Sequence, residues 1–265
     1  MLDDYTMITH RFDDEITVIP VADVHLGAIE HDQKAWESFC TKVKDEPNTY
    51  LCLVGDLVNN NTRSSVGNPF DEVYRPREQK RIMTEYLLPL KNKVLCAVSG
   101  NHERRTSAKE SDQDITYDIM ARLGIENLYR ENVVYMKISI GTRATTKAKC
   151  PNVSYTFCVT HGAAGGRLTG NPVNRAEEFA RTVQNLDVLI VGHSHKGSVT
   201  RPKRIVIDDK NNVVKEVSGV IVGAESWMQY GGYAARKMLL PAEHGFPQRL
   251  RLSRSRDYKR VTVTW

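Results

Sequence analysis

No apolar run in this sequence is long enough to cross a membrane, and its N-terminus does not resemble an export signal. The 265 residues contain no hydrophobic stretch close to the roughly 18 residues that a transmembrane helix requires. Residues 1–5 include two aspartates and lack the basic start and apolar core of a signal peptide. We therefore expect a cytoplasmic protein without a membrane partner.

The cysteines are few, odd in number and not arranged in pairs. None of the five belongs to a Cys-x-x-Cys motif, which argues against a zinc knuckle, and the odd count argues against a disulfide framework. Most have apolar neighbours, as in Leu51-Cys52-Leu53. We expect reduced thiols in the core at Cys40, Cys52, Cys96, Cys150 and Cys158.

Internal repeats, low-complexity tracts and linkers are also absent, so one domain spanning residues 1–265 is the simplest expectation. The net charge of +5 is small for the whole chain but unevenly spread. Residues 201–265 carry 13 Lys and Arg against 6 Asp and Glu, which makes this part basic. A basic surface suits a polyanionic partner, and it suits a solubilising surface without a ligand nearly as well.

The sequence does contain an alternation of short β-branched runs and amphipathic segments, which is typical of an α/β fold. Helices are expected at residues 32–43, 78–88, 115–123 (closed by Gly124) and 175–186. Strands are expected at residues 15–21, 50–54, 93–98, 133–140, 155–160 and 187–191, and in a mostly β part at 205–207, 213–222 and 261–263. Loops are expected at residues 59–65 (polar), directly after 103 (charged) and at 142–149 (basic).

Five of the expected strands end in residues that bind metal ions well. These ends are Asp23-x-His25, Gly55-Asp56, Gly100-Asn101-His102-Glu103, Thr160-His161-Gly162 and Gly192-His193-Ser194-His195. Their carboxylate, imidazole and amide groups suit divalent metals, and ligand sites collect at such strand ends. Each motif taken alone can also be interpreted without a metal, for example as a turn or as a hydrogen-bonded loop histidine. Five of the eight histidines lie in these motifs, whereas His10, His31 and His244 have no such setting and are interpreted as structural or surface residues.

The ordered set D-x-H, G-D, G-N-H-E, H and G-H-x-H resembles that of the calcineurin-like metallophosphoesterase superfamily, from Asp23 to His195. The resemblance implies a four-layer αββα sandwich with mixed sheets and two divalent metal ions at the strand ends. By this likeness, one ion is held by Asp23, His25, Asp56 and His195. The other is held by Asp56, Asn101, His161 and His193, so that Asp56 bridges the two ions.

The chemistry of that superfamily explains these residue types. Two cations roughly 3.5–4 Å apart clamp a phosphate and lower the pKa of a shared water, which attacks phosphorus in line with the leaving oxygen. The resemblance offers His102 as the group that protonates or stabilises that oxygen, and we expect Glu103 to orient a histidine from behind. Manganese is the expected metal because it suits mixed Asp, His and Asn ligation, with iron, zinc, magnesium and nickel as alternatives.

One difference from the motif of protein phosphatases limits the range of expected substrates. Protein Ser/Thr phosphatases of this superfamily carry Gly-Asp-x-Val-Asp-Arg-Gly, whereas residues 55–61 read Gly-Asp-Leu-Val-Asn-Asn-Asn, so the Asp-Arg pair is missing. The chain looks more like the DNA-repair exonuclease branch and related phage and bacterial phosphoesterases. This implies a phosphodiesterase that cuts DNA or another nucleic acid. A phosphomonoesterase or small-nucleotide phosphodiesterase is the alternative, and a non-catalytic metal-binding protein is a third interpretation.

Several basic and aromatic residues are candidates for contact with a substrate. Arg104, Arg105 and Arg167 could bind substrate phosphates, and a solvated loop is an equal alternative for them. Trp227 and Tyr230 could stack on a base, although packing in the core or at its rim is favoured. Basic residues near the C-terminus could follow a nucleic-acid backbone, with a charged face lacking a ligand favoured instead. These residues are Arg249, Arg251, Arg254, Arg256, Lys259 and Arg260.

Overall fold

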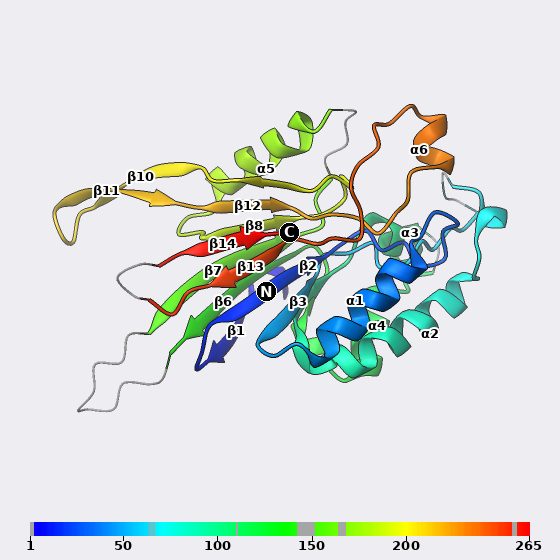
Figure 1. Ribbon diagram of the computed structural model, residues 1–265, viewed down its shortest axis with the longest axis horizontal. Coiled ribbons are helices and arrows are strands. Elements are labelled where there is room, and N and C mark those ends of the chain that lie inside the picture. The colour runs from blue at the N-terminus through cyan, green and yellow to red at the C-terminus, as the bar shows by residue number, and fades with distance from the viewer. Residues whose placement is uncertain are drawn as a thin grey trace.

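Two six-stranded mixed sheets and the helices that flank them make up the architecture (Figure 1). The computed structural model describes residues 3–63, 65, 67–109, 111–141, 152–163, 168–255 and 259–265. Cys150, Arg167, Arg256 and the basic loop expected at residues 142–149 lie outside these ranges. None of the helices within them is long and apolar enough to cross a membrane.

The first sheet has the strand order β14-β13-β2-β3-β4-β5. Four strands run parallel: β2 (Ile16–Val21), β3 (Thr49–Leu53), β4 (Val94–Val98) and β5 (Tyr129–Arg130). Two antiparallel strands extend the sheet at the other edge: β13 (Arg249–Leu252) and β14 (Val261–Thr264). Because β2, β3 and β4 point the same way, the loops after them lie at the same edge of the sheet.

The second sheet has the order β1-β6-β7-β8-β12-β9 and mixes parallel with antiparallel pairs. Its strands are β1 (Met7–Phe12), β6 (Val133–Ile140), β7 (Val153–Thr160), β8 (Val188–Val191), β12 (Val220–Gly223) and β9 (Ser198–Thr200). A separate antiparallel hairpin, β10 (Lys203–Asp208) and β11 (Val213–Ser218), extends away from this sheet (Figure 1).

Helices cover the outer face of each sheet. The β2–β4 sheet packs against α1 (Gln33–Asp45), α2 (Pro76–Leu87) and α4 (Ile115–Leu123) through one apolar cluster. The β7–β8–β12 face packs against α5 (Gly170–Thr182) through another. The remaining helical segments are α3 (Asn101–Lys109), α6 (Gly232–Arg236) and four 3-10 turns at Asp3–Tyr5, Pro69–Asp71, Leu88–Lys93 and Glu126–Leu128.

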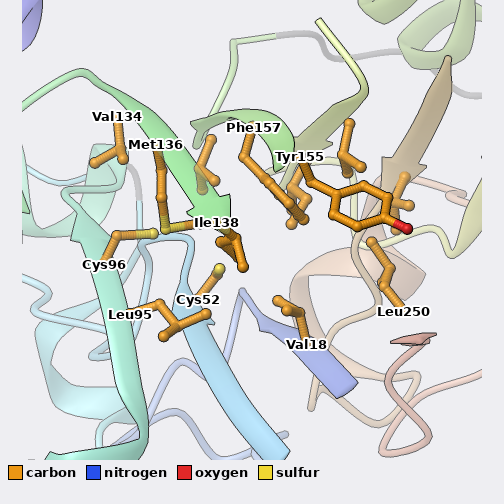
Figure 2. Close-up of a cluster of buried hydrophobic side chains, with 14 of the residues drawn as sticks. Val18, Cys52, Leu95, Cys96, Val134, Met136, Ile138, Tyr155, Phe157 and Leu250 are labelled. Atoms are coloured by element: carbon orange, nitrogen blue, oxygen red, sulfur yellow. The ribbon is translucent and has the colours of Figure 1, made fainter. Parts of the chain in front are cut away.

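A third apolar cluster lies between the two sheets and joins them. In Figure 2, Cys52 and Cys96 from the first sheet face Met136 and Ile138 of β6. All four side chains are at most 1% exposed, and the first two occur as the unpaired core thiols that the sequence predicts. The order of layers is therefore helix, sheet, sheet, helix, which confirms the expected αββα sandwich.

The first departure from expectation is α3, at a position where the sequence predicts a charged loop. The residues of α3 read N-H-E-R-R-T-S-A-K and offer no apolar stripe of period 3.6, so the pattern contains no helix signal. Polar contacts hold its first turn instead. Glu103 accepts from the Gly100 amide at 3.0 Å, and Asn60 Nδ2 donates to the His102 carbonyl at 2.8 Å.

The second departure concerns the C-terminal strands. Residues 213–222, expected as one strand, form β11 and β12, separated at Gly219, because β11 pairs with β10 and β12 pairs with β8. β13 was not expected, although its sequence Arg-Leu-Arg-Leu alternates as a strand does. Leu250 and Leu252 are fully buried, so only one side of this basic stretch faces outward. β1, β5, β9 and α6 were also not expected, and α5 begins and ends several residues before the predicted helix.

We expect Gly124→Ala to lower the free energy of unfolding by about 1 kcal/mol, because Gly124 ends α4 with a left-handed backbone, φ 70°. No atom lies within 4 Å of an added Cβ, so the backbone conformation alone causes the loss. Urea denaturation measures it. Gly170→Ala is the matched control, because Gly170 also has open space but no positive φ. Equal stability of the two variants would contradict this explanation.

Candidate metal centre

Five loops meet where the two sheets bring their strand ends together. The loops after β2, β3 and β4 come from one sheet, and those after β7 and β8 come from the other. The structure thus brings together all seven residues that the resemblance offers as metal ligands: Asp23, His25, Asp56, Asn101, His161, His193 and His195. Such a convergence of strand ends is where ligands bind in α/β folds.

The backbone of these loops is strained. Five of the candidate ligands have a left-handed backbone: Asp23 (φ 52°), His25 (49°), Asp56 (51°), His193 (69°) and His195 (55°). Each such residue costs about 1–3 kcal/mol unless its surroundings impose the conformation. The concentration of strain at these positions is typical of a functional site.

The first ligand cluster consists of Asp23, His25 and His195. His25 Nε2 and His195 Nε2 are 3.1 Å apart, and Asp23 Oδ1 lies 3.3 Å from His195 Nε2 and 3.8 Å from His25 Nε2. Burial alone would raise the pKa of Asp23, but the adjacent His195 holds it below its usual value. Three potential ligand atoms therefore converge, one of them on an ionised carboxylate.

The second cluster consists of Asp56, His161 and His193, with Asn101 beside them. Asn101 Oδ1 lies 3.1 Å from His161 Nε2 and 2.7 Å from His193 Nδ1. Burial works against a charge on His161, yet Asp56 Oδ2 at 3.2 Å raises the pKa of His161 to about 9. The charge of Asp56 thus favours a positive charge in this cluster.

Asp56 lies between the two clusters. Its Oδ2 is 3.2 Å from His161 Nε2 in one and 3.8 Å from His25 Nε2 in the other, while Oδ1 accepts from the His102 amide at 2.8 Å. The residue is 1% exposed. Burial raises its pKa, but the surrounding histidines, His161 foremost, hold the pKa of Asp56 well below its usual value.

The residues present fit two divalent cations. His25 Nδ1 lies 3.3 Å from Asn59 Oδ1, and His161 Nδ1 lies 2.8 Å from the Val54 carbonyl. Because those oxygens only accept, each ring donates through Nδ1, which leaves Nε2 to bind a metal. Asp23 Oδ1 is buried without a hydrogen-bond partner among the described residues, and such an acceptor is rarely left unpaired.

Gly55 and Gly100 allow the β3 and β4 loops to touch. A Cβ on Gly100 would lie 2.1 Å from Asp56 Oδ1, and one on Gly55 would lie 2.5 Å from the Gly100 nitrogen. No side chain fits at either position, and Gly55 also has φ 83°. The two glycines therefore let Asp56 approach the start of α3.

Glu103 has a different role from the one we expected, which was to orient a histidine. Its carboxylate accepts from the backbone amides of Asp56 at 2.9 Å, Leu57 at 2.6 Å, Val58 at 3.2 Å and Gly100 at 3.0 Å. The side chain is fully buried, and burial raises the pKa of Glu103 to about 7. Glu103 thus holds the backbone of the Asp56 loop, which the motif alone did not reveal.

The asparagines after Asp56 are functional neighbours that the sequence interpretation missed. Asn59, Asn60 and Asn61, expected in a polar loop, are each at most 9% exposed. The Asn59 carbonyl lies 2.6 Å from His102 Nδ1, and Asn61 Oδ1 accepts from Arg105 at 3.0 Å. Three successive asparagines, two residues beyond Gly-Asp, were the available signal, but nothing in their spacing shows that they face inward.

The two arginines after the Gly-Asn-His-Glu motif point to different places. Arg105 Nη2 lies 3.0 Å from His102 Nε2, and that nitrogen lies 3.9 Å from Asp56 Oδ2. Arg104 instead donates to the Gly100 carbonyl at 3.2 Å and to Asn132 Oδ1 at 3.0 Å. The side chain of Arg105 therefore contacts His102 in the candidate centre.

The basic C-terminal residues are mostly paired with acidic side chains. Their ion pairs are Arg249–Glu46, Arg251–Glu15, Arg254–Asp14 and Lys259–Asp187. This agrees with the interpretation of a charged face. Trp227 is 1% exposed and packs against Trp36 and Phe39, so it belongs to the core, whereas Tyr230 is 49% exposed. The three leftover histidines make contacts elsewhere: His10 with Leu95, His31 with Val24 and His244 with Asp32.

Comparison with known proteins identifies the family of this chain. The chain resembles, at 12% identity and a TM-score of 0.37, a conserved uncharacterized protein, a predicted phosphoesterase, from Streptococcus pneumoniae TIGR4; 94% of this chain and 98% of that one are covered. No curated protein matches the sequence. A family model described as calcineurin-like phosphoesterase matches residues 16–197, well over half of the chain and all five loops. The chain therefore belongs to the calcineurin-like phosphoesterases.

Proposed function

We propose that this chain hydrolyses phosphodiester bonds with two divalent metal ions, manganese being the favoured metal and DNA or another nucleic acid the favoured substrate. One observation carries the proposal. The buried carboxylate of Asp56 lies between the two clusters, with Oδ2 3.2 Å from His161 Nε2 in one and 3.8 Å from His25 Nε2 in the other. A carboxylate in that position offsets the charge of two cations held close together, as two-metal hydrolysis requires.

The residues around Asp56 have different roles in the proposed reaction. Two bound divalent ions would polarise the phosphoryl group and activate an attacking water. His102 faces Asp56 with Nε2 and is fixed through Nδ1 at the Asn59 carbonyl, and this contact with the centre supports a role for His102 at the leaving oxygen. Glu103, on α3, holds the Asp56 loop in place through hydrogen bonds from the Asp56 and Leu57 amides. We include Arg105 among the substrate-binding residues and assign no such contact to Arg104.

The metal and the compartment follow from the residue types. Carboxylate, imidazole and amide ligands together suit Mn²⁺, whereas thiolate ligands would select softer ions. The availability of each ion in the cell decides among the competing metals. The four cysteines in the described residues are unpaired thiols, which supports a reducing, cytoplasmic setting.

The favoured substrate class follows from the loop after Asp56. In place of an Asp-Arg pair it carries Asn59 and Asn60, whose side chains hold His25, His102 and Thr106 rather than facing outward. This supports a diester substrate over a phosphoprotein. A small-nucleotide phosphodiester is the second candidate, and the ion pairing of the C-terminal arginines favours it, because those charges are partly neutralised.

We expect the chelator-treated protein to be inactive and added Mn²⁺ to restore cleavage of bis-p-nitrophenyl phosphate and of DNA. The measurement is a panel of single- and double-stranded DNA, RNA, mononucleotides and cyclic nucleotides, with salt varied. A nuclease that contacts several phosphates loses binding steeply with salt, whereas a small-nucleotide enzyme does not. Survival of all nucleic acids while mononucleotides are cleaved would overturn the nuclease proposal.

A further inference from the structure

The chain segment that follows β12 contacts the backbone of the first ligand cluster. The Ala224 amide donates to the carbonyl of Val191, the last residue of β8, at 2.7 Å. The Trp227 amide donates to the Asp23 carbonyl at 3.1 Å. The segment is therefore tied to a strand end of the candidate centre and to the backbone of a candidate ligand. Glu225 lies between these two contacts and is 4% exposed.

Glu225 meets Gln248 at the loop that carries His195. A Cβ on Gly197 would lie 2.9 Å from Gln248 Nε2, 2.9 Å from Glu225 Cγ and 3.1 Å from Glu225 Oε1. Both side chains therefore pack against the same backbone position, two residues after His195. Gln248 directly precedes β13, and its Nε2 donates to the Gly223 carbonyl at the end of β12 at 3.0 Å, so it also links the two sheets.

Two oxygen atoms at this junction have no hydrogen bond. Gln248 Oε1 and Glu225 Oε2 are buried without a hydrogen-bond partner among the described residues. The amide of Gln248 cannot turn over, because its oxygen would then face the Gly223 carbonyl, which is also an acceptor. Of the two unpaired oxygens, only the carboxyl oxygen of Glu225 can carry a hydrogen. A proton there satisfies both atoms by donating to Gln248 Oε1, whereas a carboxylate leaves two buried acceptors unpaired.

We propose that Glu225 is a positioning residue for the first ligand cluster, and that as a neutral carboxylic acid it donates to Gln248 Oε1 and fixes the surface against which Gly197 packs. The proposal rests on the metal centre of the proposed function. Glu225 takes no part in the chemistry. It acts through the backbone of the two loops that carry Asp23 and His195.

The surroundings of Glu225 favour the neutral form. Burial raises the pKa of Glu225 to about 7, and the charge of Glu243 adds to this rise, although the Phe246 amide opposes it. Burial is thus the largest cause. The charged or titratable side chains on the segments that pack at this junction are those of Lys196, Glu243, His244 and Arg249.

Infrared difference spectroscopy of the manganese-loaded protein at pH 6 tests the proton directly. We expect the carbonyl stretch of one protonated carboxyl group to disappear in Glu225→Gln and to remain in Glu243→Gln. The same band should move to higher frequency in Gln248→Leu, which removes the acceptor. Glu243 is the matched control because it is an exposed acid of the same region. The lack of a band that depends on Glu225, or a band unchanged in Gln248→Leu, would overturn the proposal.

Isothermal titration with Mn²⁺ at pH 6 tests the positioning role. Glu225→Gln replaces an O–H donor with an N–H donor of nearly the same shape, so we expect its affinity for Mn²⁺ to be unchanged. Glu225→Ala should bind Mn²⁺ about 10- to 100-fold more weakly, as happens when a group that supports metal ligands is lost. An equal loss in both variants would show that the negative charge matters and would overturn the proposal. Full affinity in Glu225→Ala would overturn it as well.

The substitution at Gln248 keeps the test decisive if Glu225→Ala does not fold. Gln248→Leu conserves much of the side-chain volume and removes the acceptor, so it should show the loss of Mn²⁺ affinity instead. Neither measurement uses a substrate. A protein that binds Mn²⁺ and shows the expected band but hydrolyses no diester would refute the proposed function and support the role of Glu225.

Discussion

Asp56→Asn is expected to reduce metal-dependent phosphodiester hydrolysis at least about a thousandfold. The substitution keeps the size of the side chain and an acceptor for the His102 amide, but removes the charge between the two ligand clusters. Metal-ion catalysis supplies several kcal/mol, and about 4 kcal/mol corresponds to a thousandfold in rate. Elemental analysis should show fewer than two ions bound per chain, and bis-p-nitrophenyl phosphate measures the rate.

Asp118→Asn serves as the control for that experiment. Asp118, on α4, pairs with Lys80 away from the candidate centre, and its own side chain is 39% exposed, so the loss of this ion pair should cost about 1 kcal/mol. The Asp118→Asn variant should retain full metal content and activity. An Asp56→Asn enzyme that still bound two ions and hydrolysed the diester at the normal rate would show that Asp56 does not bridge a two-metal centre.

Glu103→Gln is expected to lower the free energy of unfolding by about 3–5 kcal/mol, although only one oxygen becomes an amide nitrogen. The carboxylate accepts from four backbone amides in a fully buried position. An NH₂ group facing these donors leaves at least one pair of them unsatisfied, at about 1–3 kcal/mol for each group. Metal affinity should fall about 10- to 100-fold, because the Asp56 loop loses its support.

Urea denaturation followed by tryptophan fluorescence measures this loss, since Trp36 and Trp227 pack in the core. Isothermal titration with Mn²⁺ measures the affinity. The control is Glu85→Gln, at an exposed residue paired with Arg81, which should change neither quantity. A Glu103→Gln protein as stable as the control would mean that the four amides find other partners and that Glu103 does not hold the loop.

The limits of sequence-based prediction are clearest at α3. Residues 94–98 form a continuous apolar run and were predicted correctly as a buried strand, because burial on both faces leaves a signal in composition. The helix that follows has no such signal, since polar contacts stabilise it, one with Gly100 directly before it and one with Asn60 in the loop after β3. The contacts of Glu103 with backbone amides could not be predicted for the same reason, because three of its four partners lie in a loop more than 40 residues away in the chain.

The sequence by itself determined the residue types of the candidate centre and their order. Five strand ends carry carboxylate, imidazole and amide groups, and parallel strands deliver such ends to one edge of a sheet whatever the details of packing. Only the tertiary structure decided which groups touch. It directed Arg105 to His102 and Arg104 to Asn132, although the two arginines are adjacent in the sequence. Adjacent residues on a helix point about 100° apart, and the neighbouring loops, not the sequence pattern, determine what each one meets.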